Sequence, residues 1–447
     1  MHDIAIIGAG PGGLVTALRL HQQGIKTTIY ENVPELKPLG VGVDIKVYGV
    51  KEIEELGLLE EFRAMSVDAV DSIFFNHYGQ EIYAEKCGVH MGYLHEQRFV
   101  HRGSLQMLFY RTVLERLGED AVKLGHRAVS YSQDDESVTL EIVREDGTTE
   151  HVTHSAVIAV DGIKSPTRKQ MHPDAAEPEY SGITMYRGTT VWDPIRDGHT
   201  ILHIGDPRIS TMIIYPIDDD FEGSGKQLIN WVVEVEAEES IEDWNQLGST
   251  DDVIPLYETV DIPFFDVQQL MRDAREVYLF PLIRHTPLDN WVDGRVVLLG
   301  DAAHAMYPRG GNGVCQAIVD ARVVAEKLAE FDDPHEAFVA YDRERREPVN
   351  RIVMNMRGEG YEVIRRMVAE RTEGKPFDDI ERVLPLAEAD EIFSRYHALV
   401  GQPRPGFVAG EATGFRTWDE VKAPCASRPP RPPKPRSSPS NSDGSRR

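Results

Sequence analysis

Cysteine is scarce in this chain of 447 residues. The three cysteines, Cys87, Cys315 and Cys425, are odd in number and far apart, so they offer neither a disulfide framework nor metal-ligand spacing. The sequence also lacks an apolar run long enough to cross a bilayer. The first residues lead straight into an apolar strand, without the basic region of a signal peptide. We therefore expect a cytoplasmic protein that binds no metal and does not enter a membrane.

Basic residues are few as well: 48 Lys and Arg stand against 74 Asp and Glu, which gives a formal net charge of -26. Such an acidic chain repels nucleic acid phosphates and anionic membrane surfaces, so neither is an expected partner. Hydrophobic residues make up 41% of the chain, enough for a real core, and the length suits two joined domains. The segment from Arg428 onward is rich in proline, serine and arginine and cannot bury a core.

Strands and helices alternate near the N-terminus and again after residue 296. Residues 4–7, 14–23 and 27–31 predict a strand, a helix and a second strand, which form a parallel β-α-β unit. Further helices are expected at 48–65, 105–117 and 314–330, and in the C-terminal region at 348–370 and 377–400. Between them, the segments 183–192, 200–204, 210–217 and 228–236 read as strands of an antiparallel sheet.

A glycine-rich turn joins the first strand to the first helix. Gly8-Ala9-Gly10-Pro11-Gly12-Gly13 fits G-x-G-x-x-G in the strand-to-helix context that this motif needs. Gly8 permits the tight turn, Gly10 lets the backbone approach a pyrophosphate, and Gly13 lets the helix pack on the strand. Glu31 ends the second strand, where a carboxylate can bind a ribose hydroxyl and disfavours a 2′-phosphate. The turn therefore predicts a dinucleotide site, of NAD or FAD.

A second motif ends a buried strand. Gly300-Asp301 follows the apolar run 296–299, and Gly310-Gly311-Asn312-Gly313 then opens a long helix. Asp301 could accept a hydrogen bond from a polyol, and the helix start could stabilise a negative charge such as the N1–C2=O edge of a reduced flavin. A turn aspartate beside a glycine-rich loop without a ligand explains the same residues equally well. His304 has no second ligand at metal spacing, so we interpret it as structural, and Cys315 as buried packing.

Taken together, the motifs resemble those of the class A flavoprotein monooxygenases. Gly8 to Gly13, Asp161-Gly162 and Gly300-Asp301 look like the family's GxGxxG, DG and GD motifs, and Arg102-Gly103-Ser104-Leu105 resembles its Arg-x-x-Leu. Within the family, the phenazine-type hydroxylases and then the salicylate hydroxylases are the most similar. The family implies an FAD cofactor, NADPH or NADH as a transient reductant, O₂, and hydroxylation of an aromatic ring through a C4a-hydroperoxyflavin. Its members are often monomers or homodimers.

The resemblance implies an α/β fold: a Rossmann-like FAD-binding domain, an inserted antiparallel-sheet substrate domain and a helical C-terminal region. The expected divisions are 1–75, 101–175 and 281–350 for the FAD-binding domain, 76–100 and 176–280 for the substrate domain, 351–417 for the helical region and 418–447 for a disordered tail.

The resemblance also implies which residues bind FAD. Glu31 would hold the adenosine ribose, Arg102 would lie near the pyrophosphate, and Val129 would frame the adenine. Asp161 is tied in the family to FAD and to the nicotinamide, although a plain strand-end turn explains it too. The full set of expected cofactor-binding residues is Gly8, Gly10, Gly12, Gly13, Glu31, Val43, Arg102, Val129, Asp161, Asp301, Gly311, Asn312 and Gly313.

The substrate should lie over the flavin, against the antiparallel sheet and the loop at Pro308. Tyr186, Arg187, Tyr215 and Trp231 are candidates for its pocket, although ordinary packing explains the aromatic ones as well. The sequence offers no convincing general base.

The chain departs from the family's pattern twice, at Asp44-Ile45-Lys46-Val47 and at Arg284-His285-Thr286-Pro287. Two alternatives remain open: a flavoprotein reductase or desaturase without oxygen insertion, and a non-catalytic flavin-bound scaffold.

Overall fold

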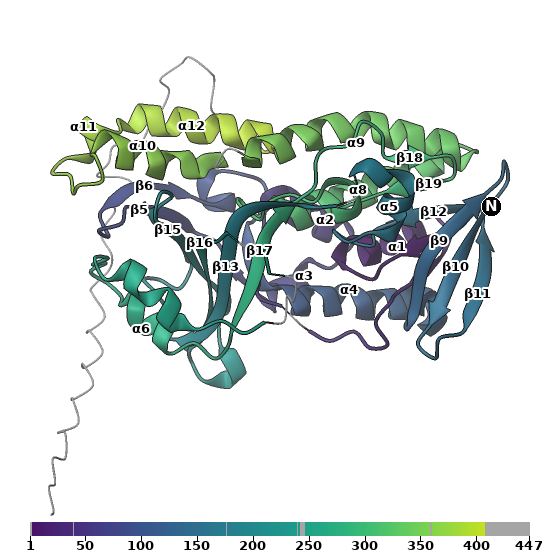
Figure 1. Ribbon diagram of the computed structural model, residues 1–447, viewed down its shortest axis with the longest axis horizontal. Coiled ribbons are helices and arrows are strands. Elements are labelled where there is room, and N and C mark those ends of the chain that lie inside the picture. Colours follow the sequence, from purple (N-terminus) through teal and green to yellow (C-terminus); the bar gives the residue numbers. More distant parts are fainter. Residues whose placement is uncertain are drawn as a thin grey trace, which may run out of the picture.

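The computed structural model describes residues 2–38, 40–175, 177–238, 240–241, 246–357 and 360–406. The expected disordered tail at 418–447 lies outside this part of the chain. Two large sheets lie side by side along the length of the molecule (Figure 1). In the part of the chain that the structure describes, no helix is long and apolar enough to span a membrane.

The first sheet is built on the expected β-α-β unit. It has six strands in the order β18-β19-β12-β1-β2-β8, and β1, β2, β8, β12 and β19 run parallel. These strands are β1 (Asp3–Ile7), β2 (Lys26–Tyr30), β8 (Val122–Lys123), β12 (Ala156–Ala159), β18 (Val292–Asp293) and β19 (Val296–Leu298). Because β1, β12 and β19 are parallel neighbours, the residues that follow them gather at one edge, as in other doubly wound sheets. That edge receives the three glycine-containing motifs.

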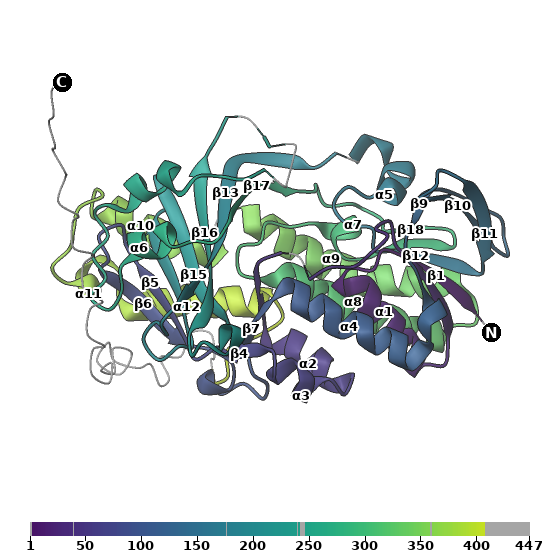
Figure 2. The ribbon, with the colours of Figure 1, turned by 90° about the horizontal axis from the view of Figure 1, so that it is seen from below.

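Helices α1 (Pro11–Gln22), α4 (Arg102–Leu117) and α8 (Asn312–Glu330) pack together beside this sheet (Figure 2). A small antiparallel sheet of β9 (His126–Gln133), β10 (Val138–Arg144) and β11 (Thr149–His154) lies at the N-terminal end of the molecule (Figure 2). The expected helix at 48–65 is interrupted. It forms α2 (Val47–Glu55) and α3 (Leu59–Arg63), because Gly57 between them adopts a φ of 71°, which ends a helix.

The second large sheet has seven strands in the order β17-β13-β16-β15-β14-β5-β6. Its strands are β5 (Asp71–Phe75), β6 (Glu81–Lys86), β13 (Glu179–Trp192), β14 (Thr200–Asp206), β15 (Ser210–Asp218), β16 (Gln227–Glu236) and β17 (Val277–Arg284). All pairs are antiparallel except β5 with β14. The sheet therefore begins at Asp71 and ends at Arg284, a few residues outside the divisions expected at 76 and 280. The division into domains itself stays a prediction.

A short sheet of β4 (Ser66–Asp68), β7 (Arg98–His101) and β3 (Gly42–Ile45) connects the two large sheets. The C-terminal region is helical, as expected, with α9 (Pro334–Arg357), α10 (Val363–Arg371), α11 (Ile380–Val383) and α12 (Leu386–Leu399). These helices run along one side of both sheets (Figure 1). We expected a helix to begin at Pro348, but this proline lies inside α9, which already begins at Pro334.

The seven-stranded sheet has two different faces. On its outer face, α6 (Val267–Arg272) and neighbouring short helices cover an apolar cluster that includes Trp231, Leu270 and Met271. Its inner face is turned toward β3 and the C-terminal helices, where Tyr215 contacts Gly42 and Arg365 bonds to Ile204. Directly opposed residues of an antiparallel pair share a face, so the register assigns Arg187, Val232 and Ile213 to one face.

Candidate functional site

The glycine turn after β1 leaves open space in front of helix α1. A Cβ atom on Gly8, whose φ is 102°, would lie 2.5 Å from the carbonyl oxygen of Val160, and one on Gly13 would lie 2.0 Å from that of Gly8. A Cβ on Gly10 would meet no atom within 4 Å. Gly8 and Gly13 are therefore required by the fold itself, whereas Gly10 borders the space that a pyrophosphate would occupy. Gly12 instead lies against Val160 and Ala317.

Glu31 lies beside this turn. Its carboxylate accepts hydrogen bonds from the backbone N–H groups of Ala9 (2.6 Å) and Val33 (3.0 Å), and each oxygen keeps a further lone pair for a ribose hydroxyl. Sequence reasoning missed Gln106 of α4, whose side chain donates to the carbonyl oxygen of Ala9 at 2.8 Å. The Arg102 side chain at the start of α4 is exposed, lies near Gly40, and makes no hydrogen bond or ion pair to any described residue.

Val129 occupies an irregular position in β9. Its neighbours Ala128 and Ser130 pair with Ile142 and Glu141, so Val129 is the extra residue of a β-bulge. A bulge leaves the extra residue outside the ladder, which makes its backbone groups available to a ligand. The position suits the expected contact with an adenine.

Two aspartates follow the parallel strands. Asp161 accepts hydrogen bonds from Thr167 through one carboxylate oxygen, while the other is buried and has no hydrogen-bond partner within the described ranges. Burial raises the pKa of this carboxyl. Asp301 opens α7 (Asp301–His304), directly after Gly300 with its φ of 60°. Its carboxylate is exposed and bonds to no described residue. Both aspartates thus keep acceptor oxygens that a polyol or a cofactor could use.

His304 is structural, as expected. It is buried, and Nε2 lies 2.6 Å from a carboxylate oxygen of Asp320, which also contacts Arg345 at 2.7 Å and the backbone N–H of Gly300 at 3.4 Å. This group of residues fixes the Gly300 turn from behind. The expectation of buried packing for Cys315 also agrees with its complete burial in the first turn of α8.

The loop before α8 turns sharply at Gly310 (φ 81°) and Gly311 (φ 68°). Asn312 is fully buried: its oxygen accepts from Tyr48 (2.8 Å) and its amide donates to Tyr396 (2.8 Å). The Asn312 side chain therefore anchors the loop, and only its backbone could face a flavin. Gly313 has open space beside it, with the nearest described atom 4.0 Å from a Cβ placed there.

Strand β3 passes under the inner face of the seven-stranded sheet, and its middle residue Val43 pairs with Val100 of β7. A Cβ on Gly42 would lie 2.7 Å from Tyr215 and 2.8 Å from Asn230. The side-chain oxygen of Asn230 accepts a hydrogen bond from the N–H of Gly42 (2.8 Å), and Arg187 donates to the carbonyl oxygen of Gly42 (3.2 Å). Asn230 Nδ2 and Arg187 Nε are buried without partners among the described residues, and burial lowers the pKa of Arg187.

Arg187 and Tyr215 therefore lie beside Gly42 on the inner face, while two other candidates lie on the outer face. Trp231 is fully buried on the outer face, where its indole N–H donates to Thr190 (3.1 Å). Tyr186 points to the same face and donates to Asp252 (3.3 Å). Successive strand residues point to opposite faces, so Tyr186 and Arg187 could never both face the flavin. Sequence reasoning missed Asn230, although an asparagine inside an apolar strand is itself a signal.

A cavity of about 280 Å³ opens between the inner face and α10. Tyr307 and Arg309 line it, whereas the exposed Pro308 between them is not one of the lining residues. Arg309 pairs with Glu234 (2.8 Å), and Arg365 pairs with Glu362, which lies 3.1 Å from His203. This volume is at the lower end of the range for small-molecule sites. The same loop that leads to the start of α8 thus also borders the cavity.

These features fit an FAD molecule. The residues offer space at Gly10, free acceptors at Asp161 and Asp301, free donors at Arg187 and Asn230, and a helix start at Gly311 where negative charge is stabilised. A Rossmann-like domain joined to a second antiparallel sheet, with a cavity beside the loop that they share, defines a class of flavin-dependent oxidoreductases. Among the described residues, no cluster of side chains could hold a metal ion.

Comparisons with known proteins agree. A family model described as an FAD binding domain matches residues 1–356. The phenazine 1,6-dicarboxylic acid hydroxylase of Lysobacter antibioticus is 34% identical over 405 residues, which cover 89% of this chain and 97% of that protein.

Solved structures share the fold. A salicylate hydroxylase in a substrate complex has a TM-score of 0.67 at 23% identity, covering 91% of this chain and 99% of that one. A Klebsiella pneumoniae protein with FAD and uric acid has a TM-score of 0.67 at 22% identity, covering 90% and 93%. The chain belongs to the FAD-binding family of class A flavoprotein monooxygenases. It is an FAD- and NAD(P)H-dependent monooxygenase.

Proposed function

We propose that this enzyme hydroxylates a small aromatic molecule that is phenolic, carboxylated or N-heteroaromatic. The observation that carries the proposal is the cavity of about 280 Å³, because its rim at Tyr307–Arg309 belongs to the loop that leads to the expected flavin edge at Gly311. Bound FAD supplies the oxygen chemistry, with electrons from NADH or NADPH. The chain's own residues bind and orient the ring and exclude water from it.

We propose that FAD contacts the residues expected from the sequence: Gly8, Gly10, Gly12, Gly13, Glu31, Val43, Arg102, Val129, Asp161, Asp301, Gly311, Asn312 and Gly313. In support, Gly10 borders open space, and Arg102 and Asp301 make no polar side-chain contact with any described residue. For Gly12, which is packed against protein, and for Asn312, the contact would involve backbone atoms only.

We further propose that Arg187 and Tyr215 face the flavin and the aromatic ring. The Arg187 side chain is half-buried, with its Nε buried. Desolvating a guanidinium without a carboxylate partner is costly, and an anionic or acceptor group on the ligand offsets this cost. Arg187 has no ion pair among the described residues; it donates to the Gly42 carbonyl and lies 5.7 Å from the centre of the Phe280 ring. This supports an electron-rich substrate with an acidic group. Arg309 and Arg365, which line the far side of the cavity, add positive charge that would attract such a group.

The test is oxygen uptake by the purified yellow protein with NADH or NADPH. Phenazine 1,6-dicarboxylic acid, 3-hydroxybenzoate, salicylate and urate are added one at a time, and H₂O₂ is measured in parallel. We expect one of them to stimulate uptake without matching H₂O₂ release. Uptake recovered entirely as H₂O₂ with every compound contradicts the substrate proposal. Flavin reduction without any uptake favours a reductase, and a protein that binds no FAD contradicts the site as a whole.

Arg187→Met separates a binding role from a structural one. Losing a half-buried charge that has no ion pair among the described residues should leave the apoprotein as stable as before or more so, while the KM for an acidic substrate rises. Arg275→Met is the matched control, because Arg275 also lies over an aromatic ring, that of Phe221 at 5.2 Å, but away from the cavity. An unchanged KM in Arg187→Met argues against the contact.

Three further properties are proposals of the same kind: O₂ as the co-substrate, a cytoplasmic location, and a monomer or homodimer. Mass photometry of the purified protein reports the last directly.

A further inference from the structure

A buried ion pair joins Asp44 of β3 to Lys46, the residue directly after this strand, at the first departure from the family's pattern. The ammonium of Lys46 is 2.7 Å from a carboxylate oxygen of Asp44, and the two side chains are only 14% and 9% exposed. The amide of Gln97 donates to both oxygens of Asp44 at 3.0 Å. The pKa of Lys46 is raised: burial lowers it, but the attraction of Asp44 outweighs that effect. Lys46 is therefore a cation in the folded protein.

The pair lies against the start of α8, a helix of 19 residues. A Cβ placed on Gly311, the residue before this helix, would be 3.2 Å from the Cβ and carbonyl oxygen of Asp44. The backbone N–H of Lys46 donates to the sulfur of Cys315, in the first turn of the same helix, at 3.4 Å. Two unit charges thus adjoin the helix end that carries the partial positive charge of the helix dipole.

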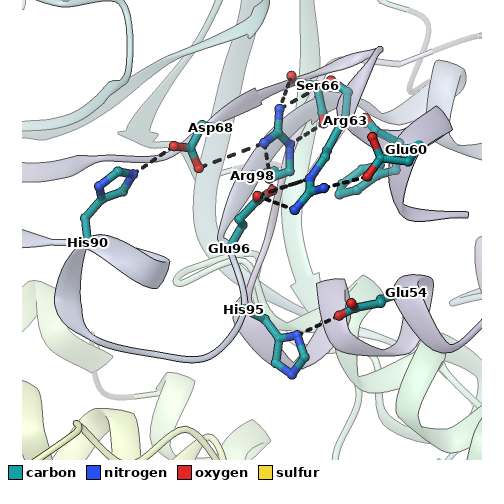
Figure 3. Close-up of polar contacts among 10 residues, drawn as sticks. Glu54, Glu60, Arg63, Ser66, Asp68, His90, His95, Glu96 and Arg98 are labelled. Carbon is teal, nitrogen blue, oxygen red and sulfur yellow. Dashed lines mark hydrogen bonds and ion pairs between the residues drawn. The ribbon is translucent and has the colours of Figure 1, made fainter.

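A network of partly buried polar side chains fixes the segment of Gln97, the residue that holds Asp44. Gln97 lies between Glu96 and Arg98, which Figure 3 shows tied to the neighbouring elements. Arg98 donates to the Ser66 hydroxyl (2.7 Å), and Glu96 pairs with Arg63 (2.7 Å). His90 and His95 contact Asp68 (2.8 Å) and Glu54 (2.9 Å) on either side (Figure 3). The segment that presents Gln97 is therefore held at several points, and the orientation of the carboxylate is defined.

We propose that Asp44 and Lys46 set the reduction potential of the flavin through their opposite charges. The inference rests on the proposed position of the flavin edge beside Gly311. Uptake of two electrons and one proton turns the neutral oxidised flavin into an anion, with its charge at the N1–C2=O edge. Asp44 disfavours that anion, and Lys46 neutralises Asp44, so the helix end keeps its favourable field. Charges act more strongly here than at the surface because both side chains are largely buried.

The experiment measures the midpoint potential of the FAD-loaded protein by slow reduction with a reference dye. Lys46→Met leaves Asp44 uncompensated, so we expect a more negative potential. Asp44→Asn leaves Lys46 uncompensated, so we expect a more positive one. A tenfold change in the ratio of reduced to oxidised flavin is the expected size for each, which is about 30 mV for a two-electron couple. The double variant removes both charges and should return close to the wild-type potential.

The matched control is Lys26→Met. Lys26 also pairs with an aspartate, Asp3 at 3.5 Å, but the pair lies where β1 and β2 begin. That is about 15 Å along the strand from the glycine turn. The midpoint potential of FAD in Lys26→Met should equal that in the wild type.

Opposite shifts support the proposal because loosened packing gives no reason for a change of sign. Shifts of one sign in both single variants, or no shift in either, overturn it. If Lys46→Met does not fold, Asp44→Asn and the double variant decide: equal potentials in these two overturn the proposal. None of these outcomes depends on finding the aromatic substrate, whose absence would count against the proposed function alone.

Discussion

Replacing Gly10 or Gly13 by alanine separates what the glycine turn does for the fold from what it does for the cofactor. Around Gly10 a new methyl group meets no protein atom within 4 Å, and the backbone at φ -67° and ψ 172° is one that alanine adopts readily. Around Gly13 the methyl group would be 2.0 Å from the Gly8 carbonyl oxygen, so α1 must move off β1 by more than about 1 Å.

The magnitudes follow from these distances. Overpacking of a tight helix–strand contact costs about 1–3 kcal/mol, so the apoprotein of Gly13→Ala should lose that much stability. Gly10→Ala weakens a helix N-cap slightly but restricts the unfolded chain, and these effects of about 0.5–1 kcal/mol offset each other. Its methyl group does occupy the space where the pyrophosphate approaches, so FAD should bind at least about tenfold more weakly, which is about 1.4 kcal/mol.

The assay has two parts. Urea unfolding of the apoproteins, followed by circular dichroism, gives stability without the contribution of bound ligand. Quenching of flavin fluorescence gives the Kd for FAD. We expect Gly10→Ala to change only the Kd, and Gly13→Ala to change both. A Gly10→Ala protein that binds FAD like the wild type would refute the reasoning, because the open space would then not be the pyrophosphate site.

Three other properties can be checked in the same preparations. Asp320→Asn should lower the free energy of unfolding by about 3–5 kcal/mol, because Arg345 then loses its buried counter-charge. The control is Asp342→Asn. Asp342 pairs with Arg346, which is 30% exposed, so this variant should lose much less stability in the same urea titration. In a Cys425→Ser background, the two remaining thiols should react with Ellman's reagent at about pH 8 only when the protein unfolds. Cys87 and Cys315 are buried, and burial raises the pKa of both, that of Cys315 to about 12. Fast labelling of the native protein contradicts this. Acid should destabilise the protein from about pH 4.5 toward pH 2. Burial raises the pKa of Glu85, but His397 and Arg404 lower it to about 2. The ionised Glu85 therefore stabilises the fold above its usual pKa of 4.5, and this stabilisation is lost as the pH falls toward the folded-state pKa. Glu85→Gln should flatten that part of the stability curve.

The cofactor cradle could be predicted from the sequence because each of its signals is local. Gly8 to Gly13 combine a required turn with a strand before it and a helix after it, and six adjacent residues suffice to define that arrangement. The same holds for Gly300-Asp301. The helix at 48–65 was predicted too long because Gly57, a single residue, can be tolerated inside a helix or end it, and only packing decides.

The substrate face could not be predicted because strand parity is not a local property. Tyr186 and Arg187 are adjacent on β13, and which of them points inward depends on the register with β16 and on the irregularity between Tyr180 and Thr184. The position of Trp231 follows from the same register. Trp231 lies opposite Gly188, where a Cβ would collide with the indole, so the Trp231 side chain belongs to the outer face. Pairings between residues more than forty positions apart decide all of this.

The second departure from the family's pattern acquires a meaning only in three dimensions. Arg168, seven residues after Asp161, is fully buried and pairs with no carboxylate in the described part of the chain. Its guanidinium donates to four carbonyl oxygens: those of Ala175, Thr286, Ala302 and Ala303. His285 adds a bond to the Ile163 carbonyl at 2.6 Å. The segment around Thr286 therefore joins the turn after Asp161 to the helix that Asp301 opens. Of the departing residues, Thr286 makes this connection through its backbone carbonyl and His285 through its imidazole. Many side chains at 286 and 287 would keep the backbone contact, so the pattern can change there while the cradle is kept.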